Sequence, residues 1–150
     1  MIDINKIYIK QRENFLNIFY NSVKGICLNV KGEVISKIYE KNKSMYIDIK
    51  LDNNVINDLI FLEKFLILKL KESNINIISI FNKNNIITLK IPVYKNKISN
   101  NVQICKDGQP ISIYDITLNK ECNFEILLDT LWIFTENKAM YKWKLKTVTL

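Results

Sequence analysis

The sequence predicts a mainly β fold of the α+β class, an antiparallel barrel or sandwich with one or two helices. Short apolar runs recur along the chain with turn-forming residues between them, which indicates about eight strands in hairpin order. Only one long segment has a strong helical period. The 150 residues, 48% hydrophobic and 25% charged, fit a single domain over residues 1–150 with a core of its own.

The first third of the chain is expected to hold strands and one short helix. Phe15, Ile18 and Phe19 recur at helical spacing, which predicts a helix from Arg12 to Asn21. Gly32 suits a tight turn, so the segments beside it are expected to form a hairpin. In order, the elements expected are a strand over Ile4–Ile9, this helix, hairpin strands over Lys24–Val30 and Glu33–Glu40, a turn over Lys41–Ser44 and a strand over Met45–Leu51.

The long helix is expected to begin at Asn53 or Asn54 and to end near Glu72. Leucines recur along one face of it, and we expect that face to pack across the barrel. The elements expected after it are a hairpin of Ile75–Phe81 with Ile86–Ile91, a loop over Tyr94–Asn101, a strand over Val102–Cys105, a turn over Lys106–Pro110, a helical turn within Ser112–Leu118 and a long hairpin of Asn123–Thr135 with Ala139–Thr149.

Composition excludes several functional classes. The net charge of +7 attracts polyanions, but Arg12 is the only arginine, which argues against reading guanine edges in a duplex. The chain has no histidine, and its carboxylates and glycines form no catalytic or phosphate-binding pattern. We therefore expect no enzymatic activity, no cofactor and no metal site.

The cysteines and the apolar segments indicate the cellular compartment. Cys27, Cys105 and Cys122 lie far apart, as small semi-buried thiols in a reducing compartment do. The amino terminus has no hydrophobic signal stretch, and charged residues interrupt the most apolar segment, Val55–Leu70. An intracellular protein without a membrane partner is expected.

The carboxy-terminal segment alternates aromatic or apolar residues with lysines. Tyr141, Trp143 and Leu145 are expected on one face of a strand, and Lys142, Lys144 and Lys146 on the other. Exposed rings stack with bases while lysines contact phosphates, which favours single-stranded nucleic acid as the ligand. The alternative is that Trp143 and its neighbours are core and that the lysines form a solvated outer face.

Two further places combine rings with an exposed or basic strand face. Trp132 and Phe134 share one face of a strand whose other face is also apolar, which indicates either a central strand covered on both sides or a ligand-binding face. Tyr46 shares its face with Lys50, opposite Ile47 and Ile49, so it is a candidate for stacking or for cross-strand packing.

From Val102 onward the chain resembles the OB-fold single-stranded-DNA-binding proteins of large nucleocytoplasmic DNA viruses, which are related in fold to phage replication proteins of the same kind. The segments that carry the resemblance are Lys106-Asp107-Gly108-Gln109-Pro110-Ile111, Trp132-Ile133-Phe134, Asn137-Lys138 and Trp143-Lys144. Where the family often has Phe-Gly before the last strand, this chain has Ala139-Met140. The resemblance implies an OB-like barrel and a viral DNA-binding protein at the replication site, in the host cytoplasm or nucleus.

The function expected from these features is sequence-tolerant binding of single-stranded DNA during replication or recombination. RNA as a ligand and a homo-oligomeric state are left open. The expected binding residues are Tyr46, Lys50, Trp132, Phe134, Lys142, Trp143, Lys144 and Lys146. The alternative is a viral structural or replication-complex assembly subunit that acts through protein–protein contacts.

Overall fold

The computed structural model describes residues 2–81, 84–95, 97–98 and 102–150. The chain divides into two compact units. Unit 1 comprises Met1–Ile26, Asn53–Phe81 and Leu128–Lys142, and unit 2 comprises Cys27–Asp52, Asn82–Leu127 and Trp143–Leu150. A single domain over residues 1–150 stays a prediction, because this division does not show whether either unit folds alone.

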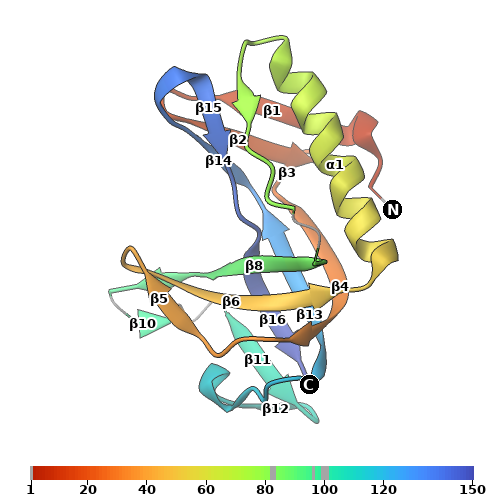
Figure 1. The fold of residues 1–150 in the computed structure, drawn as a ribbon, viewed down its shortest axis with the longest axis vertical. Coiled ribbons are helices and arrows are strands. Elements are labelled where there is room, and N and C mark those ends of the chain that lie inside the picture. Colours follow the sequence, from red (N-terminus) through yellow and green to blue (C-terminus); the bar gives the residue numbers. More distant parts are fainter. Residues whose placement is uncertain (1, 82–83, 96, 99–101) are drawn as a thin grey trace. The chain divides into compact units, whose positions relative to one another are not determined.

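Unit 2 is built around a closed barrel of five strands (Figure 1). Strands β16, β13, β4 and β6 are neighbours in that order, and β8 closes the barrel by pairing with both β6 and β16. The barrel strands are β4 (Ile26–Val34), β6 (Ser44–Leu51), β8 (Ile86–Ile91), β13 (Glu121–Leu128) and β16 (Lys144–Thr149). The mainly β class and the barrel are therefore confirmed.

Alternation along the barrel strands separates an inner face from an outer face. On β6 the side chains of Ile47, Ile49 and Leu51 are buried, as the sequence predicted. Inward residues of the other strands complete the core: Val30, Val34, Ile87, Leu89, Ile91, Phe124, Ile126, Leu145 and Val148. The outer face of β6 and β8 is consequently left for polar and basic residues.

Shorter elements extend the barrel sheet within unit 2. Strand β5 (Tyr39–Lys41) pairs with β6 across a turn in which Asn42 and Lys43 have positive φ. Strand β11 (Gln103–Lys106) runs parallel to β16 and also pairs with β12 (Gln109–Pro110). The remaining elements are a small hairpin of β9 (Val93–Tyr94) with β10 (Lys97–Ile98) and the 3-10 turn η2 (Ile113–Asp115). The predicted helical turn and the predicted end of β8 before Pro92 are confirmed.

Unit 1 is a sheet with one face covered by helix α1 (Asn53–Lys71) (Figure 1). Its strand order is β1-β2-β14-β15-β7, and β3 pairs with β2. The strands are β1 (Ile7–Gln11), β2 (Phe15–Tyr20), β3 (Val23–Lys24), β7 (Asn76–Ile77), β14 (Thr130–Ile133) and β15 (Lys138–Met140), with 3-10 turns η1 (Ile4–Lys6) and η3 (Thr135–Asn137).

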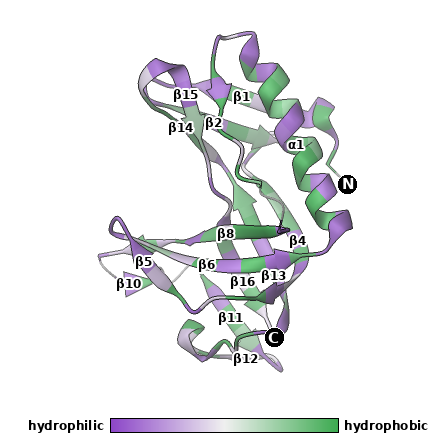
Figure 2. Ribbon diagram, viewed as in Figure 1, coloured by the Kyte–Doolittle hydropathy of each residue, from purple (hydrophilic) through white to green (hydrophobic). Residues whose placement is uncertain are grey.

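The predicted long helix is confirmed as α1, and its amphipathic pattern is visible as alternating hydrophobic and hydrophilic bands (Figure 2). Leu59, Leu62, Leu66 and Leu70 are all buried. The helix belongs to unit 1 together with the sheet, and the expectation that it packs across the barrel of unit 2 stays a prediction. Within the described residues, no helix has both the length and the apolar character needed to span a bilayer.

One buried carboxylate ties α1 to its own unit. Glu63 accepts hydrogen bonds from the hydroxyls of Ser79 (2.7 Å) and Tyr141 (2.7 Å) and from the backbone N–H of Ile80 (3.1 Å). A buried carboxylate needs such donors to replace the water it loses. Burial and the neighbouring Glu63 raise the pKa of Tyr141 far above its ordinary range, so its phenol stays protonated and donates.

The predicted helix over Arg12–Asn21 is wrong, because β2 occupies this segment. Leu16 and Ile18 are buried on one face, whereas Phe15 and Phe19 point to the other. Aromatic and branched residues fit a strand flanked on both sides, and β2 pairs with β1 and β14. Long-range pairing therefore overrode the helical spacing.

The predicted hairpin at Gly32 is also wrong, because β4 runs through it without a turn. A Cβ atom at Gly32 would lie 3.0 Å from Leu51 Cδ2 and 3.2 Å from the carbonyl oxygen of Lys50. Glycine is therefore needed here for the close approach of β6, and not for a turn.

Two other predicted hairpins change their partners. Strands β7 and β8 lie in different units, and part of the expected turn, residues 82–83, lies outside the described residues, as do residues 96 and 99–101 of the expected loop. The long carboxy-terminal hairpin is split, since β13 pairs with β16 whereas β14 pairs with β15. The antiparallel expectation is only partly right: β8–β16, β11–β16 and β15–β7 are parallel pairs.

Candidate nucleic-acid interface

A row of two tyrosines and two lysines crosses the outer face of the barrel in unit 2. Tyr46 on β6 is paired with Tyr39 on β5 and with Lys90 on β8. Lys90 is in turn paired with Lys144 on β16. Paired residues project from the same face of a sheet, so these four side chains form one transverse set, which we call the tyrosine–lysine row.

The alternation of β6 and β8 explains why these side chains point outward. Ile47 and Leu89, the neighbours of Tyr46 and Lys90, are buried in the barrel. Tyr46, Lys90 and Lys144 are each half-buried, so part of every side chain reaches the surface. The backbone N–H of Lys90 donates to the carbonyl of Trp143 at 2.9 Å, which fixes β8 beside the start of β16.

Tyr39 is held by a hydrogen bond and packs beside Tyr46. The ring centroids of Tyr39 and Tyr46 are 5.8 Å apart, at an interplanar angle of 36°. The Tyr39 hydroxyl donates to Asp48 Oδ1 at 2.8 Å, and the Thr88 hydroxyl donates to the same oxygen at 2.7 Å. Burial, followed by the bond to Asp48, raises the pKa of Tyr39. An aromatic pair with one hydrogen-bonded member is suited to stacking.

The lysines of the row concentrate positive charge. Lys90 and Lys144 occupy facing positions on neighbouring strands, where like charges destabilise a sheet unless an anion lies close to them. Lys50 is exposed on the same face of β6, but Asp48 separates it from Tyr46, and Glu33 of β4 is opposite to it. The prediction that Tyr46 and Lys50 share a face is confirmed, and Lys90 is the lysine paired directly with Tyr46.

The predicted lysine ladder is divided between the two units, and its continuity as one surface stays a prediction. The alternation itself is confirmed, because Tyr141, Trp143 and Leu145 are buried. Lys142, however, belongs to unit 1, and Lys146 lies 3.6 Å from the Glu125 carboxylate and 3.7 Å from Cys27 Sγ. Of the three lysines, Lys144 is the one that joins the row.

Trp143 is wrongly assigned as a binding residue. Its side chain is only 1% exposed and is among the largest buried side chains of the chain. A base cannot stack on a ring that solvent does not reach. The alternative interpretation, in which Trp143 is core, is the correct one.

Trp132 and Phe134 are exposed in unit 1, by 50% and 54%. Trp132 packs beside Phe15, with ring centroids 5.4 Å apart. The interpretation of this strand as covered on both sides is therefore wrong, and the alternative of an open face remains. Both rings belong to a different unit from the tyrosine–lysine row.

Sequence reasoning missed Tyr39 and Lys90. The signal for Lys90 is the alternation of Ile87, Leu89 and Ile91 with Thr88 and Lys90, which is typical of a strand with Lys90 on its outer face. The pairing of β8 with β6 and β16 could not be read from it, because β8 was expected to pair with Ile75–Phe81.

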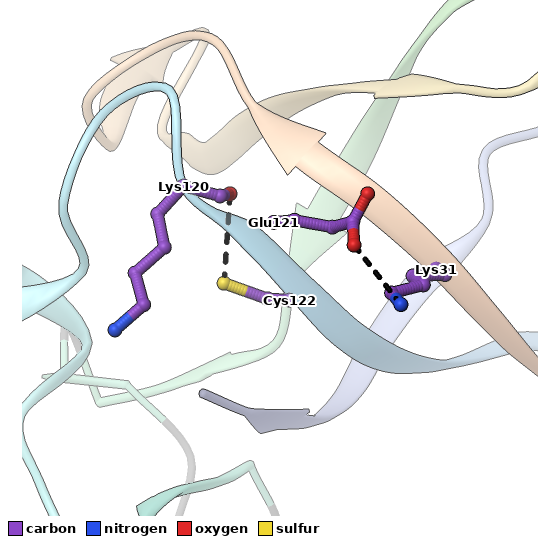
Figure 3. A network of polar contacts seen from close by, with 4 residues as sticks. All are labelled: Lys31, Lys120, Glu121 and Cys122. Atoms are coloured by element: carbon purple, nitrogen blue, oxygen red, sulfur yellow. Dashed lines mark hydrogen bonds and ion pairs between the residues drawn. The ribbon is translucent and has the colours of Figure 1, made fainter.

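A carboxylate and a thiol on β13 of unit 2 have structural partners. Glu121 forms an ion pair of 3.0 Å with Lys31, and the Cys122 thiol contacts the carbonyl of Lys120 at 3.7 Å (Figure 3). Burial raises the pKa of Cys122, which disfavours the reactive thiolate. All three cysteines are free.

Comparison with known proteins found no relative of this chain. The chain matches no protein-family model, no curated protein and no solved structure. The function is therefore inferred from the residues themselves.

Proposed function

We propose that this protein binds single-stranded DNA without strict sequence preference, by an OB-like barrel. Counted along the chain, β6 and β8 are the second and third barrel strands. OB-folds bind oligonucleotides on the face of these two strands. The topology supports the OB-like assignment, and the protein would coat strands in replication or recombination at an intracellular, viral replication site without catalysing a reaction.

The observation that carries the proposal is the tyrosine–lysine row on β6, β8 and β16. Tyr46 offers part of its ring to a base, while Lys90 and Lys144 stand beside it at the spacing of neighbouring strands. Rings and ammonium groups arranged in this way bind the two repeating parts of a nucleic-acid strand. The partner is single-stranded DNA, with RNA as the variant to be tested.

A second candidate function is an assembly subunit that acts through protein–protein contacts. The observation in its favour is the outer side of α1, where Phe61 and Leu68 are 55% and 68% exposed. They are seven residues apart and so share one side of the helix. Salt separates the two candidates, because apolar association does not weaken with salt as phosphate binding does.

The test is a titration of labelled oligo-dT, the matched duplex and single-stranded RNA at two salt concentrations. Tyr46→Ala should weaken oligo-dT binding by about 1–3 kcal/mol while leaving the thermal midpoint nearly unchanged. Lys90→Gln with Lys144→Gln should lower the salt slope by about 1.4, since each phosphate contact contributes about 0.7 on single strands. The control is the double variant Lys31→Gln with Lys106→Gln, which removes two positive charges at positions outside the row.

If the two double lysine variants lose oligo-dT affinity equally, binding depends on the net charge of the protein and not on the position of the lysines. An unchanged affinity in Tyr46→Ala together with a salt-independent interaction would remove the proposal and favour the assembly subunit.

A further inference from the structure

The sheet of unit 1 has one covered face and one open face. Leu16, Ile18, Leu131 and Ala139 are buried on the face toward the core. The register places the alternate residues of the same strands together on the other side. We call this side the open sheet face; it carries Tyr8, Lys10, Phe15, Phe19, Lys24, Trp132, Lys138 and Met140.

The open sheet face presents its rings as two pairs. Tyr8 and Phe19 have centroids 6.1 Å apart, and Phe15 and Trp132 have centroids 5.4 Å apart. Tyr8 is 63% exposed, and Met140, which is paired with Trp132, is 43% exposed. Asn17, which is buried, lies between the two ring pairs on β2.

So much exposed aromatic surface costs free energy unless a ligand covers it. A ring stabilises the folded state in proportion to the apolar area that folding removes from water. Because Tyr8 and Trp132 remain about half exposed, each of them gives about half of that stabilisation. The turn after β14 adds Phe134, whose ring is also exposed.

The positive charge of the open sheet face indicates the class of ligand that it favours. Lys10, Lys24 and Lys138 are exposed on this face, and the strand positions that share it hold no carboxylate among the described residues. One acidic group approaches from the turn, Glu136, at 3.4 Å from the Lys138 ammonium group. Rings bordered by lysines match a strand of unpaired bases, and a sheet with exposed aromatic residues is an established way of stacking them.

A hollow at one end of this face supports the same ligand. It has a volume of about 510 Å³, and its lining residues include Tyr8, Phe19, Lys6 and Lys10. This volume is within the range of small-ligand sites, and the lining offers a stacking surface and a phosphate contact side by side.

We propose that the open sheet face is a second binding surface for single-stranded nucleic acid, with Trp132 and Tyr8 as its main stacking residues. It has the ligand class of the proposed function but uses residues of unit 1 only. It can therefore be present or absent independently of the tyrosine–lysine row.

The two tryptophans allow a direct test. Trp143 is buried, so a ligand that quenches intrinsic fluorescence by stacking must act on Trp132. Unlabelled oligo-dT should quench the wild-type protein strongly and saturably, and Trp132→Phe should abolish the quenching. Because phenylalanine keeps a stacking ring, Trp132→Phe should bind with near wild-type affinity, whereas Trp132→Ala and Tyr8→Ala should each weaken binding about 5- to 150-fold.

Variants in the barrel separate this proposal from the proposed function. In Tyr46→Ala, quenching of Trp132 should persist. If wild-type fluorescence and the affinity of Trp132→Ala are unchanged while Tyr46→Ala binds weakly, the open sheet face is not a nucleic-acid surface and the barrel site stands. The reverse pattern would remove the barrel site and keep the sheet.

A protein ligand is the remaining outcome. If the wild-type protein forms dimers in sedimentation experiments, Trp132→Ala is monomeric, and oligo-dT causes no quenching, the face is an interface between copies of this chain and the proposal is overturned.

Discussion

Truncation of Trp143 tests whether this ring belongs to the core or to a binding surface. Trp143→Ala removes a side chain that is 1% exposed, next to the first strand position of β16. Replacing a buried large aromatic residue by alanine costs about 3–5 kcal/mol of unfolding free energy. At about 2–4 °C per kcal/mol for a chain of this size, the thermal midpoint should fall by about 6–20 °C.

The backbone bond from Lys90 to the Trp143 carbonyl does not depend on the side chain, so the loss should come from the cavity. Far-UV circular dichroism with urea measures the unfolding free energy. Trp132→Ala is the matched control, and it should cost roughly half as much because its ring is 50% exposed. Below the unfolding transition, Trp143→Ala should still bind oligo-dT. A loss of unfolding free energy below about 1 kcal/mol, combined with lost binding, would refute the assignment of Trp143 to the core.

Two further predictions concern stability. Gly32→Ala should lower the unfolding free energy by about 1–3 kcal/mol, because its Cβ would lie 3.0 Å from Leu51 Cδ2; a wild-type urea midpoint would contradict the close approach of the strands. Tyr141→Phe removes the hydroxyl that donates to Glu63 and should cost about 1.5–3 kcal/mol at neutral pH. Since the pKa of Tyr141 is raised above 10.0 in the folded protein, its contribution is complete below pH 10.0 and is lost above it. Tyr141→Phe should therefore flatten the alkaline decline in unfolding free energy, and an equally steep decline would show that Tyr141 does not cause it.

The spacing of polar and apolar residues was enough to predict the long helix and the faces of several strands, although it gave the wrong element for β2. The buried leucines of α1, the inward set on β6 and the shared face of Tyr141, Trp143 and Leu145 follow from spacing. That this last face is buried was one of two alternatives until the structure decided it. This works because side-chain direction is a local property, repeating every 3.6 residues in a helix and every two in a strand. The outward direction of Tyr46 and Lys144 was predictable for the same reason.

Strand pairing was decided by the tertiary structure. The sequence contains no local sign that β8 lies between β6 and β16, that β14 leaves the barrel sheet to pair with β2, or that Gly32 serves a close approach. Consequently Lys90 and Tyr39 were missed, and Trp132 was grouped with residues of the other unit. Pairing depends on long-range contacts whose cost is the entropy of closing the chain between them, and that balance is set by the whole fold. The sequence therefore determined which side chains point outward, and the tertiary structure determined which of them stand together.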